Sequence, residues 1–179
     1  MSRKIQIGVI GSDADLPIDH RTLSLARELG RQIATHEAIL VCGGGGGIMM
    51  AVAQGAKEVG GITVGVLPFL DKEVANEFID VVICTGMGWG IQGGLLVRSV
   101  DGVIVVGGGC GTLAELAMAY MHEKPVVAIR GTGGWADSLA GKFLDDRQIT
   151  QIGSATSAME AVELIWNRLS VDGKPESRA

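Results

Sequence analysis

The chain has 179 residues, 47% of them hydrophobic, and a formal net charge of -5 at pH 7, which fits one ordinary domain with a buried core. This acidic balance, without a basic stripe, argues against a nucleic-acid-binding surface. No apolar run approaches the length of a membrane span, so we expect no membrane partner. No signal-like segment opens the chain, and the three cysteines, Cys42, Cys84 and Cys110, are too few and too scattered for a disulfide framework. We therefore expect a cytoplasmic protein with reduced thiols.

Short β-branched runs alternate along the chain with longer segments of helical periodicity, which is typical of βαβ units around a parallel sheet. The predicted strands are Ile5–Ile10, Ile39–Cys42, Ile62–Leu67, Ile79–Cys84, Val103–Val106, Val126–Ile129 and Ile149–Ile152. The predicted helices are Pro17–His36, Ile48–Val59, Gln92–Val100, Thr112–His122, Trp135–Leu144 and Ser157–Leu169.

These elements predict an α/β fold: a doubly wound, Rossmann-like, three-layer α/β/α sandwich with a mainly parallel sheet of six or seven strands. We expect one ligand-binding domain over residues 1–169 and a flexible C-terminal tail over residues 170–179. Asp15 is a candidate cap of the first helix and Thr156 of the last. The strand Ile79–Cys84 fits either beside the first strand or at an edge of the sheet.

Two glycine-rich loops, Gly43–Gly47 and Gly107–Thr112, each follow an apolar strand and open a helix. Successive backbone N–H groups in such a loop can surround an anion, and the helix dipole adds about half a positive charge. Glycine there also permits tight turns and close packing of helix on sheet, which explains a single loop about as well as ligand binding does. Two such loops at the same edge of the sheet favour binding of a phosphorylated small molecule.

Glu115 lies three residues after Thr112, in the first turn of the same helix. An acid at this position can simply complement the helix dipole. It can also face the ligand and act as an acid or base.

Other motifs argue against competing chemistries. The segment Gly88–Gly93 matches the dinucleotide fingerprint G-x-G-x-x-G, but the next strand carries no acid to hold a ribose, so we do not expect NAD. The histidines His20, His36 and His122 show no metal-ligand spacing with the cysteines, so we expect no protein-ligated metal.

The segment Gly107–Glu115 resembles the P-G-G-x-G-T-x-x-E motif of the LONELY GUY phosphoribohydrolases, which activate cytokinins. It is more similar to the molybdenum cofactor carrier proteins of the same superfamily, which often have glycine where the hydrolases have proline. The resemblance extends from Ile5 to Leu169 and includes Gly43–Gly47, Gly65–Pro68 and Lys124–Val127. It implies a homo-oligomer, a dimer or a tetramer.

The hydrolases use the glutamate matched by Glu115 together with an arginine of the preceding helix. Ungapped alignment back from Asp101 puts Gln92 at that arginine, whereas Arg98 matches a further arginine of the helix. Glutamine can hydrogen-bond a sugar or a phosphate, but it cannot supply a fixed cation. The resemblance thus implies a carrier of molybdenum cofactor (molybdopterin) as bound cargo, its ring near Trp89 and Gln92.

Two alternatives stay open: a nucleoside 5′-monophosphate phosphoribohydrolase with Glu115 as the catalytic carboxylate, and a sensor of another nucleotide. The ligand, a pterin or a nucleotide, is not decided by the sequence. The predicted ligand-binding residues are Gly11, Ser12, Gly43, Gly44, Gly45, Gly46, Gly47, Gln92, Arg98, Gly107, Gly108, Gly109, Gly111, Thr112 and Glu115.

Overall fold

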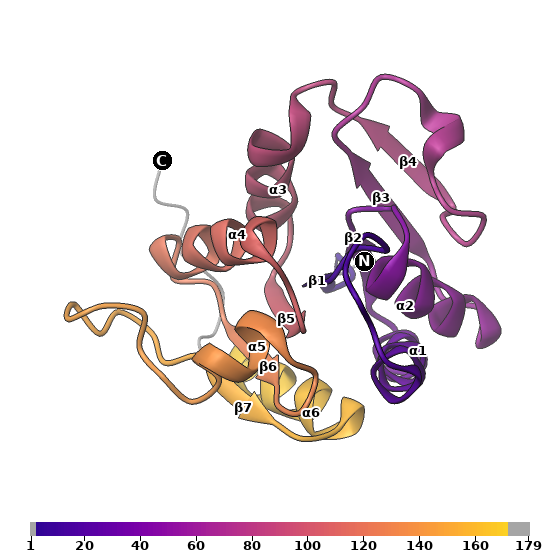
Figure 1. Ribbon diagram of the computed structural model, residues 1–179. Helices are drawn as coiled ribbons and strands as arrows, with labels where there is room; N and C mark the ends of the chain where they lie inside the picture. Colours follow the sequence, from indigo (N-terminus) through magenta and orange to yellow (C-terminus); the bar gives the residue numbers. More distant parts are fainter. Residues whose placement is uncertain (1–2, 172–179) are drawn as a thin grey trace.

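The computed structural model describes residues 3–171 as a seven-stranded sheet with helices on both faces (Figure 1). The strands are β1 (Gln6–Gly11), β2 (Ile39–Cys42), β3 (Thr63–Leu67), β4 (Val81–Cys84), β5 (Gly102–Val106), β6 (Val126–Ile129) and β7 (Gly153–Ala155). The helices are α1 (His20–Thr35), α2 (Gly47–Glu58), α3 (Gly88–Ser99), α4 (Cys110–Met121), α5 (Gly134–Leu139) and α6 (Ala158–Val171), with a 3-10 turn η1 (Lys72–Val74).

Two apolar cores separate the three layers. On one face, α1, α2 and α6 pack on alternate side chains of the strands, such as Ile7 and Val9 of β1. On the other face, α3, α4 and α5 cover the intervening residues, such as Ile10 of β1 and Val105 of β5. Apolar side chains on both faces explain why these strands are continuous apolar runs. The predicted doubly wound sandwich is confirmed.

All strand pairs are parallel, in the order β4-β3-β2-β1-β5-β6-β7. The chain winds from β1 toward β4 on one side and from β5 toward β7 on the other. The direction reverses between β1 and β5, where their carboxyl ends leave a crevice typical of ligand sites in such sheets. The strand whose position the sequence left open is β4, at the edge beside β3.

Several predicted helix starts or N-terminal capping residues were wrong. Helix α1 begins at His20 rather than at Pro17, because Asp19, not Asp15, accepts the hydrogen bond from the Thr22 N–H, at 2.6 Å. In the last helix the side chain of Ser157, not of Thr156, accepts from the Glu160 N–H, at 3.2 Å. The glycines Gly88 and Gly90 do not stop α3 from starting four residues before the predicted Gln92.

The predicted strand Ile149–Ile152 was wrong, since the last strand is Gly153–Ala155. The backbone of Ile152 exchanges hydrogen bonds with Lys142 and Gly141 instead of with β6, so pairing starts one residue later. Residues 170 and 171 of the predicted tail belong to α6, and 172–179 lie outside the described residues.

Candidate functional site

A cleft of about 640 Å³ opens at the crevice between the ends of β1 and β5. It is lined by the end of β1, the loop after β1, the start of α4 and the neighbouring helix α3. The lining residues are Val9, Ile10, Gly11, Asp13, Asp15, Leu16, Gly43, Met49, Trp89, Gln92, Gly109, Cys110, Gly111, Thr112 and Glu115. Seven of the predicted ligand-binding residues are therefore brought to one cavity.

The N-terminal turn of α4 lines this cleft. Gly109 is the N-cap residue and makes no side-chain cap, and Cys110, Gly111 and Thr112 follow at the first three helical positions. Amides at these positions have no acceptor within the helix, and the helix dipole adds about half a positive charge there. An added Cβ at Gly111 would meet nothing within 4 Å, so a ligand oxygen can approach its backbone.

The glycines just before this turn have a structural role. Gly107 donates its N–H to Thr132 Oγ1 at 2.9 Å, and Gly108 donates to Ser12 Oγ at 2.8 Å. Both glycines have positive φ, 64° and 106°, and neither is among the lining residues. Ser12 and Thr132 thereby hold the loop so that α4 starts at the cleft.

Thr112 is one of the predicted ligand-binding residues, but its hydroxyl donates to the carbonyl of Gly11 at 3.1 Å. The side chain is buried, so this bond ties α4 to the end of β1. The donors left for a ligand on this wall are the backbone amides and the thiol of Cys110, which is exposed.

The loop Gly43–Gly47 contributes only Gly43 to the cleft, whereas Gly47 lines a second hollow of about 480 Å³ between α1 and α2. Asn76 holds the loop: its Nδ2 donates to the carbonyls of Gly44 at 3.1 Å and Gly45 at 2.8 Å. Asn76 thus satisfies two carbonyls of a loop that otherwise lies outside the cleft.

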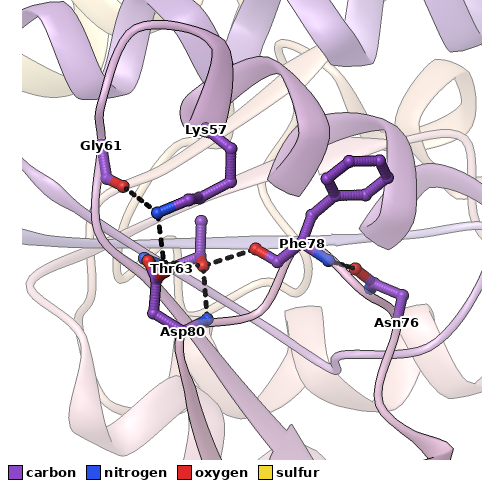
Figure 2. Close-up of polar contacts among 6 residues, drawn as sticks. All are labelled: Lys57, Gly61, Thr63, Asn76, Phe78 and Asp80. Atoms are coloured by element: carbon purple, nitrogen blue, oxygen red, sulfur yellow. Dashed lines mark hydrogen bonds and ion pairs between the residues drawn. The ribbon is translucent and has the colours of Figure 1, made fainter.

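Figure 2 shows how Asn76 belongs to the edge of the sheet: its Oδ1 accepts from the N–H of Phe78 at 3.1 Å. The Phe78 carbonyl accepts from Thr63 Oγ1 at 2.6 Å, and the Asp80 carboxylate pairs with Lys57 Nζ at 2.6 Å. This network ties β3, β4 and α2 to the first glycine loop. No local sequence pattern points to Asn76, because its contacts join residues about thirty positions apart.

Glu115 lies on the cleft wall without a hydrogen bond or an ion pair from the described part of the chain. Burial raises the pKa of its carboxyl to about 7, from an ordinary 4.5, because the charged form is poorly solvated there. Helix α3 packs closely on it: a Cβ at Gly93 would lie 2.6 Å from Glu115 Cγ. Glu115 is thus poised to change protonation near neutral pH, as an acid/base group does.

Two residues of α3, the helix that packs on Glu115, also line the cleft. Gln92 is 4% exposed, and its Nε2 donates to the carbonyl of Val66, on β3, at 2.5 Å. Trp89 is 63% exposed and packs edge-to-face on Phe69 with ring centroids 5.4 Å apart. The fingerprint-like glycines Gly88–Gly93 belong to this helix, not to a phosphate-binding turn after a strand.

Arg98 lies outside the cleft. It is near the C-terminal end of α3, about 9 Å along the axis from Gln92, and its Nη1 lies 3.2 Å from His122 Nε2. Among residues 3–171, no arginine, lysine or histidine lines the cleft.

The structure adds residues that sequence reasoning did not select. Asp13 and Asp15, in the loop after β1, put two carboxylates into the cleft, and Leu16 packs over Gly109. Their signal was the acidic segment directly after the first strand, at the carboxyl edge of the sheet.

In residues 3–171, no group of three or more His, Cys, Asp or Glu side chains could hold a metal ion. No helix in this part of the chain is long and apolar enough to cross a membrane.

The sequence of this chain is similar to a known protein family and to characterised proteins. The sequence model of the SLOG cluster4 family matches residues 4–162. A cytokinin riboside 5′-monophosphate phosphoribohydrolase of Mycobacterium tuberculosis is 39% identical over 122 residues, 63% of this chain and 65% of that protein.

Two solved structures are similar over nearly their whole length. The molybdenum cofactor binding protein of Rippkaea orientalis is 31% identical, with a TM-score of 0.82 over 94% of this chain and 99% of its own. The molybdenum cofactor carrier protein of Chlamydomonas reinhardtii is 36% identical, with a TM-score of 0.79 over the same shares.

Proposed function

The chain belongs to the SLOG cluster4 family, and on that premise we propose that it binds a phosphorylated small molecule in the β1–β5 cleft as a molybdenum cofactor carrier. One observation carries this proposal: the cleft has free helix amides and an acid, Glu115, but no basic side chain of the described residues. A carrier has only to hold phosphate and ring. A hydrolase also has to stabilise charge as an N-glycosidic bond breaks.

In this proposal the phosphate lies on the amides of Gly109–Thr112, which bind an anion without a basic residue. The ring system extends toward Gln92 and the exposed face of Trp89. Similarity to the molybdenum cofactor proteins over more than nine tenths of the chain supports this choice of cargo.

The rival function is a nucleoside 5′-monophosphate phosphoribohydrolase, and the state of Glu115 favours it. A carboxyl with a pKa near 7 can give a proton to a departing base at neutral pH. Against it stands Gln92, which occupies the position of the hydrolases' arginine and is hydrogen-bonded to Val66.

Mass spectrometry of the ligand released from protein purified without oxygen tests the cargo. We expect a pterin with a phosphate group. Release of a purine nucleotide instead would contradict the carrier proposal while leaving the phosphate site intact.

A second assay separates carrier from hydrolase. Incubation with AMP, followed by measurement of free adenine, should give a rate near background for the wild type. Gln92→Arg should raise the rate only while Glu115 is present, since one acid/base group contributes about two to four orders of magnitude. Rapid release of adenine by the wild type, lost in Glu115→Gln, would establish the hydrolase instead.

A further inference from the structure

The side-chain amide of Gln92 has a defined orientation. Its Nε2 donates to the carbonyl oxygen of Val66 at 2.5 Å, and a carbonyl can only accept, so the NH₂ group must face the sheet. The other amide atom, Oε1, is an acceptor. No fully buried side-chain oxygen or nitrogen in residues 3–171 lacks a partner, and Gln92 lines the cleft, so its Oε1 opens into the cleft.

The carboxyl groups near Gln92 are acceptors when they are ionised, which for Glu115 requires a pH above its pKa of about 7. Glu115 and Gln92 line the same cleft, and Gly93, the residue after Gln92, packs on Glu115 with a Cβ position 2.8 Å from its Oε1. Asp13 and Asp15, in the loop after β1, add two more carboxylates to the lining of the cleft. The donors are the amides of Cys110 and Gly111 at the start of α4, about one helical turn before Glu115. The start of α4 thus suits an anion, whereas the oxygens of Gln92 and of ionised Glu115 suit N–H groups.

Purine and pterin rings differ in what their edges offer to such a wall. Guanine and pterins share a 2-amino-4-oxopyrimidine edge, on which a ring N–H lies beside an NH₂ group. Adenine has an NH₂ group beside a ring nitrogen that can only accept. Against two acceptors, adenine leaves a lone pair facing an oxygen, which is costly in a buried site.

Resting on the proposed function, we propose that Gln92 and Glu115 determine ligand specificity, selecting the 2-amino-4-oxopyrimidine edge of a guanine or a pterin over adenine. Gln92 Oε1 and the Glu115 carboxylate accept from the two neighbouring donors. The phosphate on α4 sets the distance at which the ring meets them. The same edge occurs in a nucleotide and in a pterin, so the test includes both.

Calorimetry on the full chain at pH 8, where the Glu115 carboxyl is mostly ionised, compares GMP, AMP and IMP, which share ribose and phosphate. We expect GMP to bind on the order of tenfold to hundredfold more tightly than AMP. IMP, which keeps the ring N–H and lacks the NH₂ group, should lie between them. Fluorescence titration with 6-hydroxymethylpterin, which has the edge without a phosphate, shows whether a pterin is held as well as a guanine.

Two variants test the residues. Gln92→Arg replaces the acceptor by donors and should reduce or reverse the preference for GMP, whereas Glu115→Gln should reduce it by supplying one NH₂ group. Ser99→Ala, on the exposed side of the same helix, is the matched control and should keep the wild-type ratio. Circular dichroism checks that each variant is folded. If a variant is not folded, the ratio of the GMP and AMP affinities of the wild type still tests the inference.

The outcomes are distinct. AMP bound as tightly as GMP by the wild type, or a ratio that Gln92→Arg leaves unchanged, would overturn the specificity role while leaving the phosphate site in place. Folded wild-type protein that responds to none of the nucleotides and not to the pterin would contradict the proposed function and the specificity role together.

Discussion

The hydroxyl of Ser12 accepts a hydrogen bond from the backbone N–H of Gly108, with 2.8 Å between oxygen and nitrogen. This bond joins the ends of β1 and β5, the two strands between which the sheet changes direction. It also uses an amide that the sequence assigned to phosphate, so the ligand is left with the amides of the following turn.

We predict that Ser12→Ala lowers the free energy of unfolding by about 1–2 kcal/mol, because the half-buried N–H of Gly108 loses its acceptor. Ligand affinity should fall as well, since the first turn of α4 is no longer held. Urea unfolding and calorimetry measure the two effects. Ser138→Ala, at an exposed serine of α5, should change neither, and equal losses in both variants would contradict this role of Ser12.

Gly111→Val should abolish ligand binding without unfolding the protein. An added Cβ there meets nothing within 4 Å, so the new side chain enters the open cleft in front of the amides. Gly109→Val should also block binding. Its Cβ would lie 3.0 Å from Leu16 Cδ1, however, so this variant could also disturb the packing of Leu16. Calorimetry with GMP gives the readout. The control is Gly90→Ala, because a Cβ at Gly90 also meets nothing within 4 Å. Normal binding by folded Gly111→Val would contradict the assignment of the phosphate to the amides of α4.

Glu115→Gln should stabilise the protein at alkaline pH and not at acid pH. The pKa of Glu115 is about 7 in the folded chain against an ordinary 4.5, so both states are protonated below pH 4.5 and no cost arises. As the pH rises to 7 and above, the folded state must keep the proton or bury a charge, and wild-type stability falls relative to the variant.

The full difference above pH 7 is on the order of 3 kcal/mol. Urea unfolding at pH 4.5 and pH 8 measures it, with Glu163→Gln on the exposed face of α6 as the control. A constant difference at both pH values would show that the Glu115 carboxyl is not desolvated in solution.

Among the thiols, Cys110 should react first with a maleimide at pH 8, and bound ligand should protect it. Cys110 is exposed on the cleft wall, whereas burial raises the pKa of the Cys42 thiol to about 12 and leaves almost no thiolate. Peptide mass spectrometry with and without GMP measures the rates. Cys84, half-buried at the end of β4, is the internal reference, and equal protection of Cys84 and Cys110 would argue against a ligand at this wall.

We expect at least a dimer in solution. Helices α3 and α4 expose large apolar side chains, Trp89 at 63%, Ile91 at 61% and Met121 at 55%, and association would cover such a surface. Light scattering at micromolar concentration should give a mass of at least twice the 18.6 kDa of the chain. Ile91→Glu should shift the mass downward, and a monomeric wild type would contradict the prediction.

Much of the fold follows from local patterns. Runs such as Val103–Val106 are apolar at every position because helices cover both faces of their strands, and the alternation with helices makes the sheet parallel. The two glycine loops, Glu115 and the altered position Gln92 are also visible in the order of the residues. The boundaries Asp19 and Ser157 were missed because several residues compete for each cap, and their neighbours decide which side chain reaches an N–H.

The sequence by itself determined the sandwich, its ligand-binding edge and the chemical groups available there. Only the tertiary structure decided how those groups are used: Gly107 and Gly108 bind hydroxyls from distant loops, Arg98 lies away from the cleft, and Gln92 turns its NH₂ group to Val66. The physical reason is the range of the interactions. Burial periodicity is repeated within a few consecutive residues, whereas each of these hydrogen bonds joins residues more than twenty positions apart, which only the packing of strands and helices brings together.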